Sequence, residues 1–133
     1  MARYLLDTNH ASPLVTLHHE LRQRILAAMQ AGDVFSLCVP VLSETLFGMS
    51  VLPRAQQNRA EWERLRANLF CYQLDGQDAE FAVDLQLSLR AKGRQLAMPD
   101  ALIAAVAIRY GLVLLTADKD FRPLTQLRQA NWL

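Results

Sequence analysis

Leu5-Leu6-Asp7-Thr8-Asn9 brings an apolar segment directly to a carboxylate, and this stretch determines how the rest of the sequence is interpreted. Residues 3–6 predict a short buried strand that ends at Asp7. The same design returns in LVLLTADKDF, residues 112–121, where a continuous apolar run precedes Thr116 and Asp118. Continuous apolar strands are typical of a parallel sheet that is covered on both faces. The two stretches therefore predict two buried parallel strands that each bring an acid to one edge of a sheet.

Helical and extended patterns alternate between these two stretches. Apolar side chains recur at every fourth position over residues 17–31, which predicts an amphipathic helix. Prolines favour the first turn of a helix, so we expect helices to begin near Pro40, Pro53 and Pro99. The predicted strands lie at 3–6, 34–39, 72–74 and 112–115, and the predicted helices at 17–31, 40–51, from 53 onward, 77–93 and 99–110.

Residues 77–93 fit two patterns. Apolar residues at 83, 85, 87 and 89 alternate as in a strand, but those at 81, 85 and 89 also share one face of a helix. The alanines of this stretch and Gly93 at its end favour the helix.

Strands that alternate with helices predict an α/β fold in which a central, mostly parallel β-sheet is flanked by helices in three layers. The 133 residues match the length of one domain, so we expect a single domain over residues 1–133. In open parallel sheets, ligands bind beyond the carboxyl ends of the strands. That edge is where the sequence places its acids.

Composition excludes several classes of protein. A hydrophobic content of 52% excludes a disordered chain, and a net charge of +1 provides no general attraction to nucleic acid or membranes. Cys38 and Cys71 lie in apolar surroundings without a CxxC motif, which predicts buried thiols in a reducing compartment. The sequence shows no signal-peptide pattern and no apolar run near the ~18 residues of a membrane span. We therefore expect a cytoplasmic protein that does not bind membranes.

Four acids lie close to strand ends or helix starts. Asp7 and Asp118 follow predicted strands, and Asp100 lies in the opening turn of a predicted helix. Glu44 is the only acid in a long apolar stretch. Each acid alone has an ordinary explanation as a turn, cap or helix-dipole residue, although Glu44 fits this explanation least well. Asp120 follows Asp118 closely enough to replace it as the fourth acid.

Carboxylates that converge repel one another and require a positive partner. Oxygen ligands without His or Cys favour Mg²⁺ or Mn²⁺ over Zn²⁺. Such a site polarises a phosphoryl oxygen and activates water, which points to hydrolysis of a phosphodiester. Asn9 and Thr116 are short polar residues beside the acids, and they either support the carboxylates or bond to the backbone. His18 and His19 have no metal-ligand spacing and are predicted to be surface residues.

Four motifs resemble those of the PIN-domain family, particularly the VapC-type toxins of prokaryotic toxin–antitoxin pairs. In chain order, the motifs are LLDTN at 5–9, SETLFG at 43–48, PDALIAAVA at 99–107 and LLTADKDF at 114–121. They cover nearly the whole chain at ordinary spacing. The second motif departs from the family pattern, with Thr45 in place of an aliphatic residue and Phe47 in place of Tyr.

The resemblance implies a Mg²⁺- or Mn²⁺-dependent endoribonuclease that acts on RNA as the toxin of a toxin–antitoxin pair and inhibits translation or growth. It implies a cognate VapB-like antitoxin as a partner, and a homodimer. By motif position, Asp7 and Asp100 are implied as the principal metal ligands, with Glu44 and Asp118 completing the set of catalytic acids. The supporting positions are Asn9 and Thr116.

Two other functions remain open. A PIN-like module could bind RNA or protein without catalysis, although acids at all four motif positions argue against this. A phosphotransfer enzyme could use Asp7 as phosphoacceptor, but Asn9 stands where the haloacid-dehalogenase pattern requires a second Asp. No well-placed Lys completes a receiver-like site.

Overall fold

The computed structural model describes all 133 residues, and strands alternate with helices as the sequence predicts. The strands are β1 (Arg3–Leu6), β2 (Val34–Cys38), β3 (Phe70–Tyr72), β4 (Val113–Leu115) and β5 (Gln129–Ala130). The α-helices are α1 (Thr8–Ala11), α2 (Glu20–Gln30), α3 (Val39–Ser50), α4 (Ala55–Arg66), α5 (Gly76–Arg90) and α6 (Met98–Arg109). Two short 3₁₀ helices are η1 (Ser12–Val15) and η2 (Lys119–Phe121).

The five strands form one parallel sheet in the order β3-β2-β1-β4-β5. The chain therefore builds outward from β1 to β3, and then crosses back to add β4 on the other side of β1. The strand order reverses between β1 and β4, where Leu6 lies opposite Leu115. Ligands in open parallel sheets bind at this kind of switch point, beyond the carboxyl ends of the strands.

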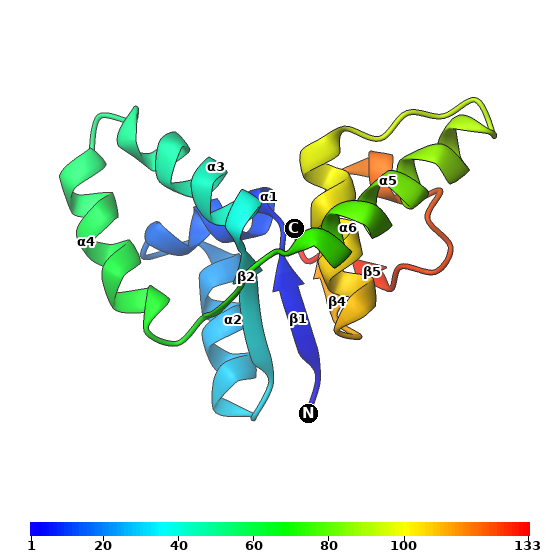
Figure 1. Cartoon of the computed structure of the whole chain (residues 1–133). Coiled ribbons are helices and arrows are strands. Elements are labelled where there is room, and N and C mark those ends of the chain that lie inside the picture. Colours follow the sequence, from blue (N-terminus) through cyan, green and yellow to red (C-terminus); the bar gives the residue numbers. More distant parts are fainter.

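The helices divide into two groups on either side of the switch point. Helices α1 to α4 lie to one side of β1 in Figure 1, and α5 and α6 lie to the other side over β4 and β5. Right-handed connections that step in opposite directions place their helices on opposite faces of a parallel sheet. The predicted α/β architecture with a parallel sheet flanked by helices is confirmed.

A continuous core of 29 buried apolar residues joins the sheet to these helices. Helix α6 is buried nearly all round, because its small side chains allow it to pack closely against its neighbours. Strands β1 and β4 contribute Leu5, Leu6, Leu114 and Leu115, none of which is exposed. No helix is both long and apolar enough to cross a membrane.

Residues 77–90 are helical within α5, as predicted, but the helix ends at Arg90 and not at the predicted residue 93. The alternating pattern arises because Val83 and Leu87 point outward, with exposed fractions of 41% and 57%, while Leu85 and Leu89 are buried. A capping box between Asp75 and Asp78 begins the helix.

Several predicted boundaries are wrong. Helix α2 begins at Glu20 rather than near residue 17, because the side chain of His19 accepts the Leu21 amide and caps the helix. Leu17 lies outside the helix and is 55% exposed. Helix α1, η1 and the two-residue strand β5 were not predicted, since elements this short carry almost no periodicity.

Two further predictions require correction. The third strand covers Phe70–Tyr72 and not residues 72–74. It lies at the edge of the sheet, where one side of the backbone has no partner strand and the apolar pattern is weak. Cys38 is buried as expected, but Cys71 in this edge strand is only partly buried.

Candidate metal centre

Asp7 lies at the switch point of the sheet, directly after β1, and is 6% exposed. Its backbone amide donates to the carbonyl of Leu115 over 3.0 Å, so the ladder between β1 and β4 continues up to the acid. Its side chain caps α1 by accepting the Thr8 amide over 2.8 Å. Asp is a preferred N-cap residue, which explains why the chain turns into a helix at this position.

Thr116 and Asn9 hold the second carboxylate oxygen of Asp7. The Thr116 hydroxyl donates to Asp7 Oδ2 over 2.7 Å, and Asn9 Nδ2 donates to the same oxygen over 3.2 Å. The Thr116 hydroxyl also accepts the amide of Asp118 over 3.0 Å. The two residues predicted as supporting residues therefore fix the orientation of Asp7, and Thr116 also links Asp7 to the Asp118 loop.

Asp100, Asp118 and Asp120 converge beside Asp7. One carboxylate oxygen from each of the three lies within 4.8 Å of the others. Asp100 projects from the first turn of α6, while Asp118 caps η2 by accepting the Asp120 amide over 2.9 Å. We refer to these three residues as the acid cluster. Both Asp118 and Asp120 lie in this cluster, and the choice of Asp118 as the fourth site acid stays a prediction.

The acid cluster is electrostatically strained. The pKa of Asp100 is raised to about 6, chiefly by burial and then by the negative charges of Asp118, Asp7, Glu44 and Asp120, in that order. None of the five ion pairs of the chain involves these acids. The chain thus concentrates negative charge here and provides no cation of its own in contact with it.

Glu44 belongs to this region but not to the tight group of three. It lies in α3, which follows β2, and its side chain is exposed. Its charge contributes to the raised pKa of Asp100. It also contributes to the raised pKa of Cys38, which reaches about 12 mainly because of burial. All four predicted acids therefore lie around one spot, with Asp100 and Asp118 in contact range and Asp7 and Glu44 at its border.

His10 is a residue of this site that the sequence analysis missed. It is completely buried, and its Nε2 accepts the backbone amide of Trp132 over 3.1 Å. Its proton must therefore lie on Nδ1, which donates to Asn9 Oδ1 over 2.6 Å. Burial lowers the pKa of His10 to about 4, so the ring is neutral at physiological pH. Because Asn9 Oδ1 also accepts the Ala117 amide, its Nδ2 must face Asp7.

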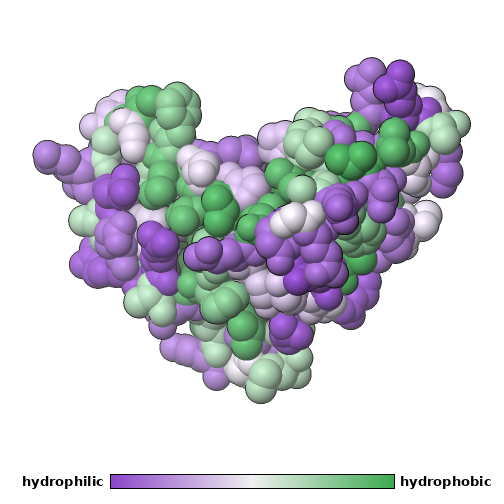
Figure 2. Space-filling model, in the orientation of Figure 1, coloured by the Kyte–Doolittle hydropathy of each residue, from purple (hydrophilic) through white to green (hydrophobic).

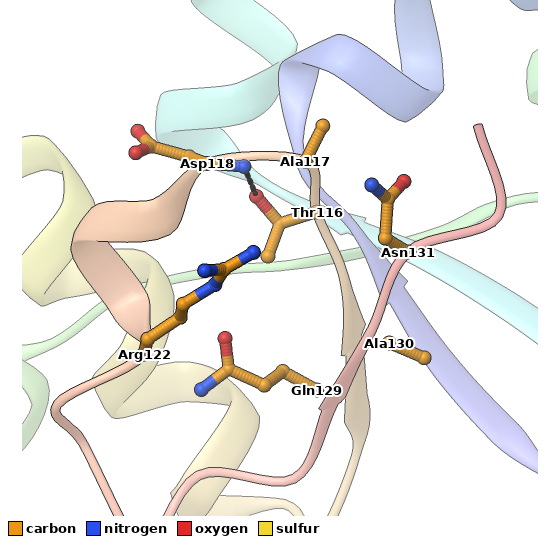
Figure 3. Close-up of a pocket in the computed structure, with 7 residues that line it drawn as sticks. All are labelled: Thr116, Ala117, Asp118, Arg122, Gln129, Ala130 and Asn131. Carbon is orange, nitrogen blue, oxygen red and sulfur yellow. Dashed lines mark hydrogen bonds between the residues drawn. The ribbon is translucent and has the colours of Figure 1, made fainter.

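Two hollows flank the acid cluster. One of about 350 Å³ is shown in Figure 3 and includes Asp118 in its wall. The other, of about 660 Å³, has Asp120 in its wall together with Arg90 and Arg94. Figure 2 shows that the same end of the molecule is hollowed between two shoulders with hydrophobic residues on both. A chain-like ligand could therefore cross the acids with parts seated on either side.

The residues present fit a hard divalent cation. The acid cluster contains only carboxylates, with no His or Cys ligand, and its oxygen atoms are spaced closely enough to share one ion. Oxygen-only ligand sets of this kind suit Mg²⁺ and Mn²⁺. A bound cation would also offset the repulsion that raises the pKa of Asp100.

Two sequence comparisons show which known proteins this chain resembles. The family model described as the PIN domain matches residues 4–126. Ribonuclease VapC2 of Rickettsia felis is 25% identical over 130 residues, which cover 97% of each chain.

Solved structures share the fold. A structure of VapBC2 from Rickettsia felis, bound to a DNA fragment from the promoter, contains a chain that superposes with a TM-score of 0.85 at 23% identity, covering 98% of this chain and 99% of that chain. A structure of VapBC-5 from Mycobacterium tuberculosis, a member of the VapBC family of toxin–antitoxin systems, gives a TM-score of 0.69 at 21% identity, covering 98% and 99%.

Proposed function

The chain belongs to the PIN-domain family, and we propose that it is a Mg²⁺- or Mn²⁺-dependent endoribonuclease that hydrolyses RNA phosphodiester bonds. One observation carries the proposal. Asp100 of α6 is surrounded by acids from the β4–η2 loop, η2, the end of β1 and helix α3, and no Arg or Lys is paired to any of them. Burial, followed by the charges of these acids, raises the pKa of Asp100 to about 6. The similarity to a protein named a ribonuclease supports RNA as the substrate.

In this proposal the acids share the task of holding the ion. Asp7 and Asp100 are proposed as the principal ligands, while Glu44 and Asp118 complete the set directly or through water, with Asp120 beside Asp118. When bound, the divalent ion polarises a phosphoryl oxygen and lowers the pKa of an attacking water. Thr116 and Asn9 keep Asp7 in one orientation, which limits the rearrangement needed when substrate arrives.

The RNA strand is proposed to cross the acid cluster between the two hollows. Arg90 and Arg94 are exposed in the hollow beside Asp120, and neither forms an ion pair within the chain. Their guanidinium groups suit phosphates of the strand. No histidine belongs to the acid cluster, so the loss of the proton from the attacking water is assigned either to a carboxylate of the cluster or to the bound metal.

We further propose that this nuclease acts as the toxin of a toxin–antitoxin pair, with a VapB-like protein as its antitoxin and a homodimer as its own assembly. The fold shared with VapBC complexes supports the antitoxin. Helix α3 and the turn after it also expose Phe47, Val51 and Leu52, with exposed fractions of 71%, 66% and 53%, which is unusual for a protein without partners. In this role, RNA cleavage would stop translation or growth until the antitoxin binds.

The test is cleavage of single-stranded RNA by the purified chain with Mg²⁺, with Mn²⁺ and with EDTA. We expect cleavage only with metal, and a loss of about 10²- to 10³-fold in Asp100→Asn. Asp84→Asn is the matched control, because Asp84 is an exposed acid of α5 outside the acid cluster. Full activity in Asp100→Asn would refute the proposal, and metal-independent RNA binding without cleavage would indicate a binding module instead.

A growth assay tests the biological role. Expression of the wild-type chain in a bacterium should arrest growth, while Asp100→Asn at the same protein level should not. An arrest by both would show that the effect on growth does not depend on the metal site.

A further inference from the structure

The hollow beside Asp118 contains three polar residues, Arg122, Gln129 and Asn131, that the proposed metal chemistry does not use. It lies between the end of β4 and strand β5 and has a volume of about 350 Å³. This volume is within the range of small-ligand pockets, which begin near ~300 Å³. The lining residues, drawn in Figure 3, are Thr116, Ala117, Asp118, Arg122, Gln129, Ala130 and Asn131.

Arg122 supplies hydrogen-bond donors to this hollow. It follows η2 directly, is exposed, and takes part in none of the ion pairs of the chain. Figure 3 shows its side chain extending between Asp118 and Gln129 and ending over the hollow. A free guanidinium group presents several N–H groups in a planar fork.

Gln129 supplies an acceptor whose direction is fixed. Its Nε2 donates to the carbonyl of Phe121 over 2.9 Å, so the side-chain amide cannot flip without losing this bond. Oε1 is left to accept, and Figure 3 shows it turned toward Arg122 and Thr116. The side-chain amide of Asn131 has the opposite hydrogen-bonding role. Its Oδ1 accepts the amide of Leu133 over 2.9 Å, which leaves Nδ2 as a donor.

The donors and acceptors of the lining favour a base over a phosphate. A phosphodiester has no N–H group that could donate to Gln129 Oε1. The Watson–Crick or Hoogsteen edge of an unpaired base carries acceptors for Arg122 and N–H groups for Gln129. Recognition of single-stranded RNA commonly uses such edges of splayed bases.

We infer that this hollow is a subsite that reads one unpaired base of the RNA next to the cleaved bond, with Arg122, Gln129 and Asn131 as the residues that determine its preference. This inference rests on the proposed function for the identity of the ligand. Asp118 lies in both the hollow and the acid cluster, so a base seated in the hollow places the adjoining phosphate beside the acids.

Cleavage of a randomised single-stranded RNA library tests the inference. Sequencing of the products should show a preference at one position next to the cut. Arg122→Met should reduce that preference about 10-fold or more at that position alone, because a correct contact to a base edge discriminates by roughly this factor. Arg122→Lys, which keeps the charge but loses the fork, should fall in between.

Arg66→Met is the matched control, because Arg66 is an exposed arginine of α4 that lines neither hollow. It should leave the preference unchanged. Two results would overturn the inference. One is a wild-type enzyme without base preference, and the other is a uniform loss of cleavage across all sequences in Arg122→Met, which would indicate a phosphate contact.

A binding experiment separates the subsite from the nuclease activity. The four nucleoside 5′-monophosphates and inorganic phosphate are titrated into the labelled wild-type chain, and the side-chain NMR signals of Arg122 and Gln129 are followed. Shifts that depend on the base support the subsite even if no RNA is cleaved. Equal shifts with inorganic phosphate, or none with any nucleotide, would overturn it.

Discussion

Acidic side chains in two parts of the molecule have opposite surroundings. Glu61 of α4 forms an ion pair with Arg22 over 2.7 Å and a second with Arg64, and the hydrogen bond from Arg22 is the main cause of its lowered pKa. In the acid cluster no arginine is present, and the pKa of Asp100 is raised to about 6. A carboxylate is therefore paired with arginines in α4, whereas in the acid cluster the carboxylates repel one another without a paired arginine.

The pairing of Arg109 with Asp75 and Asp78 shows that Glu61 is not an isolated case. Arg109 Nη1 lies 3.2 Å from Asp75 and 3.0 Å from Asp78. The chain has 14 Lys and Arg residues and uses several of them to neutralise acids elsewhere. A cluster that receives none of them is a candidate for an external cation, because such a partner relieves its repulsion.

Metal binding should produce the largest effect on stability, and this effect should depend on the acid cluster and not on Glu61. Mn²⁺ at 100 times its dissociation constant should raise the free energy of unfolding by about 2.7 kcal/mol. Asp100→Asn should abolish most of this gain, whereas Glu61→Gln should keep it. Thermal unfolding with increasing Mn²⁺ measures the effect, and an equal gain in Asp100→Asn would remove the distinction between the two regions.

Loss of the Glu61 charge should have a somewhat smaller effect of opposite sign. Glu61→Gln leaves Arg22, whose side chain is 14% exposed, without its charged partner. We expect a loss of about 2 kcal/mol in the free energy of unfolding, the range of a hydrogen bond to a charged group. Glu63→Gln on the same helix is the control. Its ion pair with Arg59 is exposed, so its loss should cost less than ~0.5 kcal/mol. Urea titration at neutral pH measures both, and equal losses would contradict the comparison.

The net dependence of stability on pH should show the smallest effect, because the contributions of Asp100 and His10 have opposite signs. The pKa of Asp100 is raised from 3.8 to about 6, so the folded protein holds more protons than the unfolded chain between these values. Without metal, this acid should therefore lower stability as pH rises through that window. His10 acts in the opposite direction. Its pKa falls from 6.5 to about 4, so its contribution to stability is lost as pH falls through this range.

The variant Asp100→Asn separates the two contributions. Its stability relative to the metal-free wild type should improve as pH rises from about 4 to 7, because only the wild type then acquires the unfavourable charge. Urea titrations in EDTA at both pH values measure this difference. A difference that does not change with pH would mean that the carboxyl group of Asp100 titrates normally in the folded protein.

Much of the fold was predictable because the relevant signals are local. The apolar runs before Asp7 and Asp118 identify strands that are buried on both faces, and prolines identify helix starts at α3 and α6. The start of α2 was misplaced because Leu17 continues the periodicity by chance beyond the His19 cap. Strand β5 has two residues and too short a pattern to be recognised.

The candidate site was predictable in part. Asp7, Glu44, Asp100 and Asp118 are recognisable from their positions at strand ends and helix starts. Asp120 was treated as an alternative to Asp118, because the sequence cannot show that η2 turns both side chains toward Asp100. His10 was missed because a buried histidine that orients an amide has no characteristic spacing to another ligand.

By itself, the sequence determined the order of strands and helices and the types of residue that follow each strand, since periodicity, prolines and caps act over a few residues. Only the tertiary structure decided which of these residues meet. Thr116 reaches Asp7 across 109 positions, and the Trp132 amide reaches His10 across 122. Such contacts depend on the pairing of β1 with β4 and of β4 with β5, and this pairing is an outcome of packing the whole sheet and its helices together. For the same reason, the hollow beside Asp118, on which the proposed base subsite depends, is formed only in the folded chain.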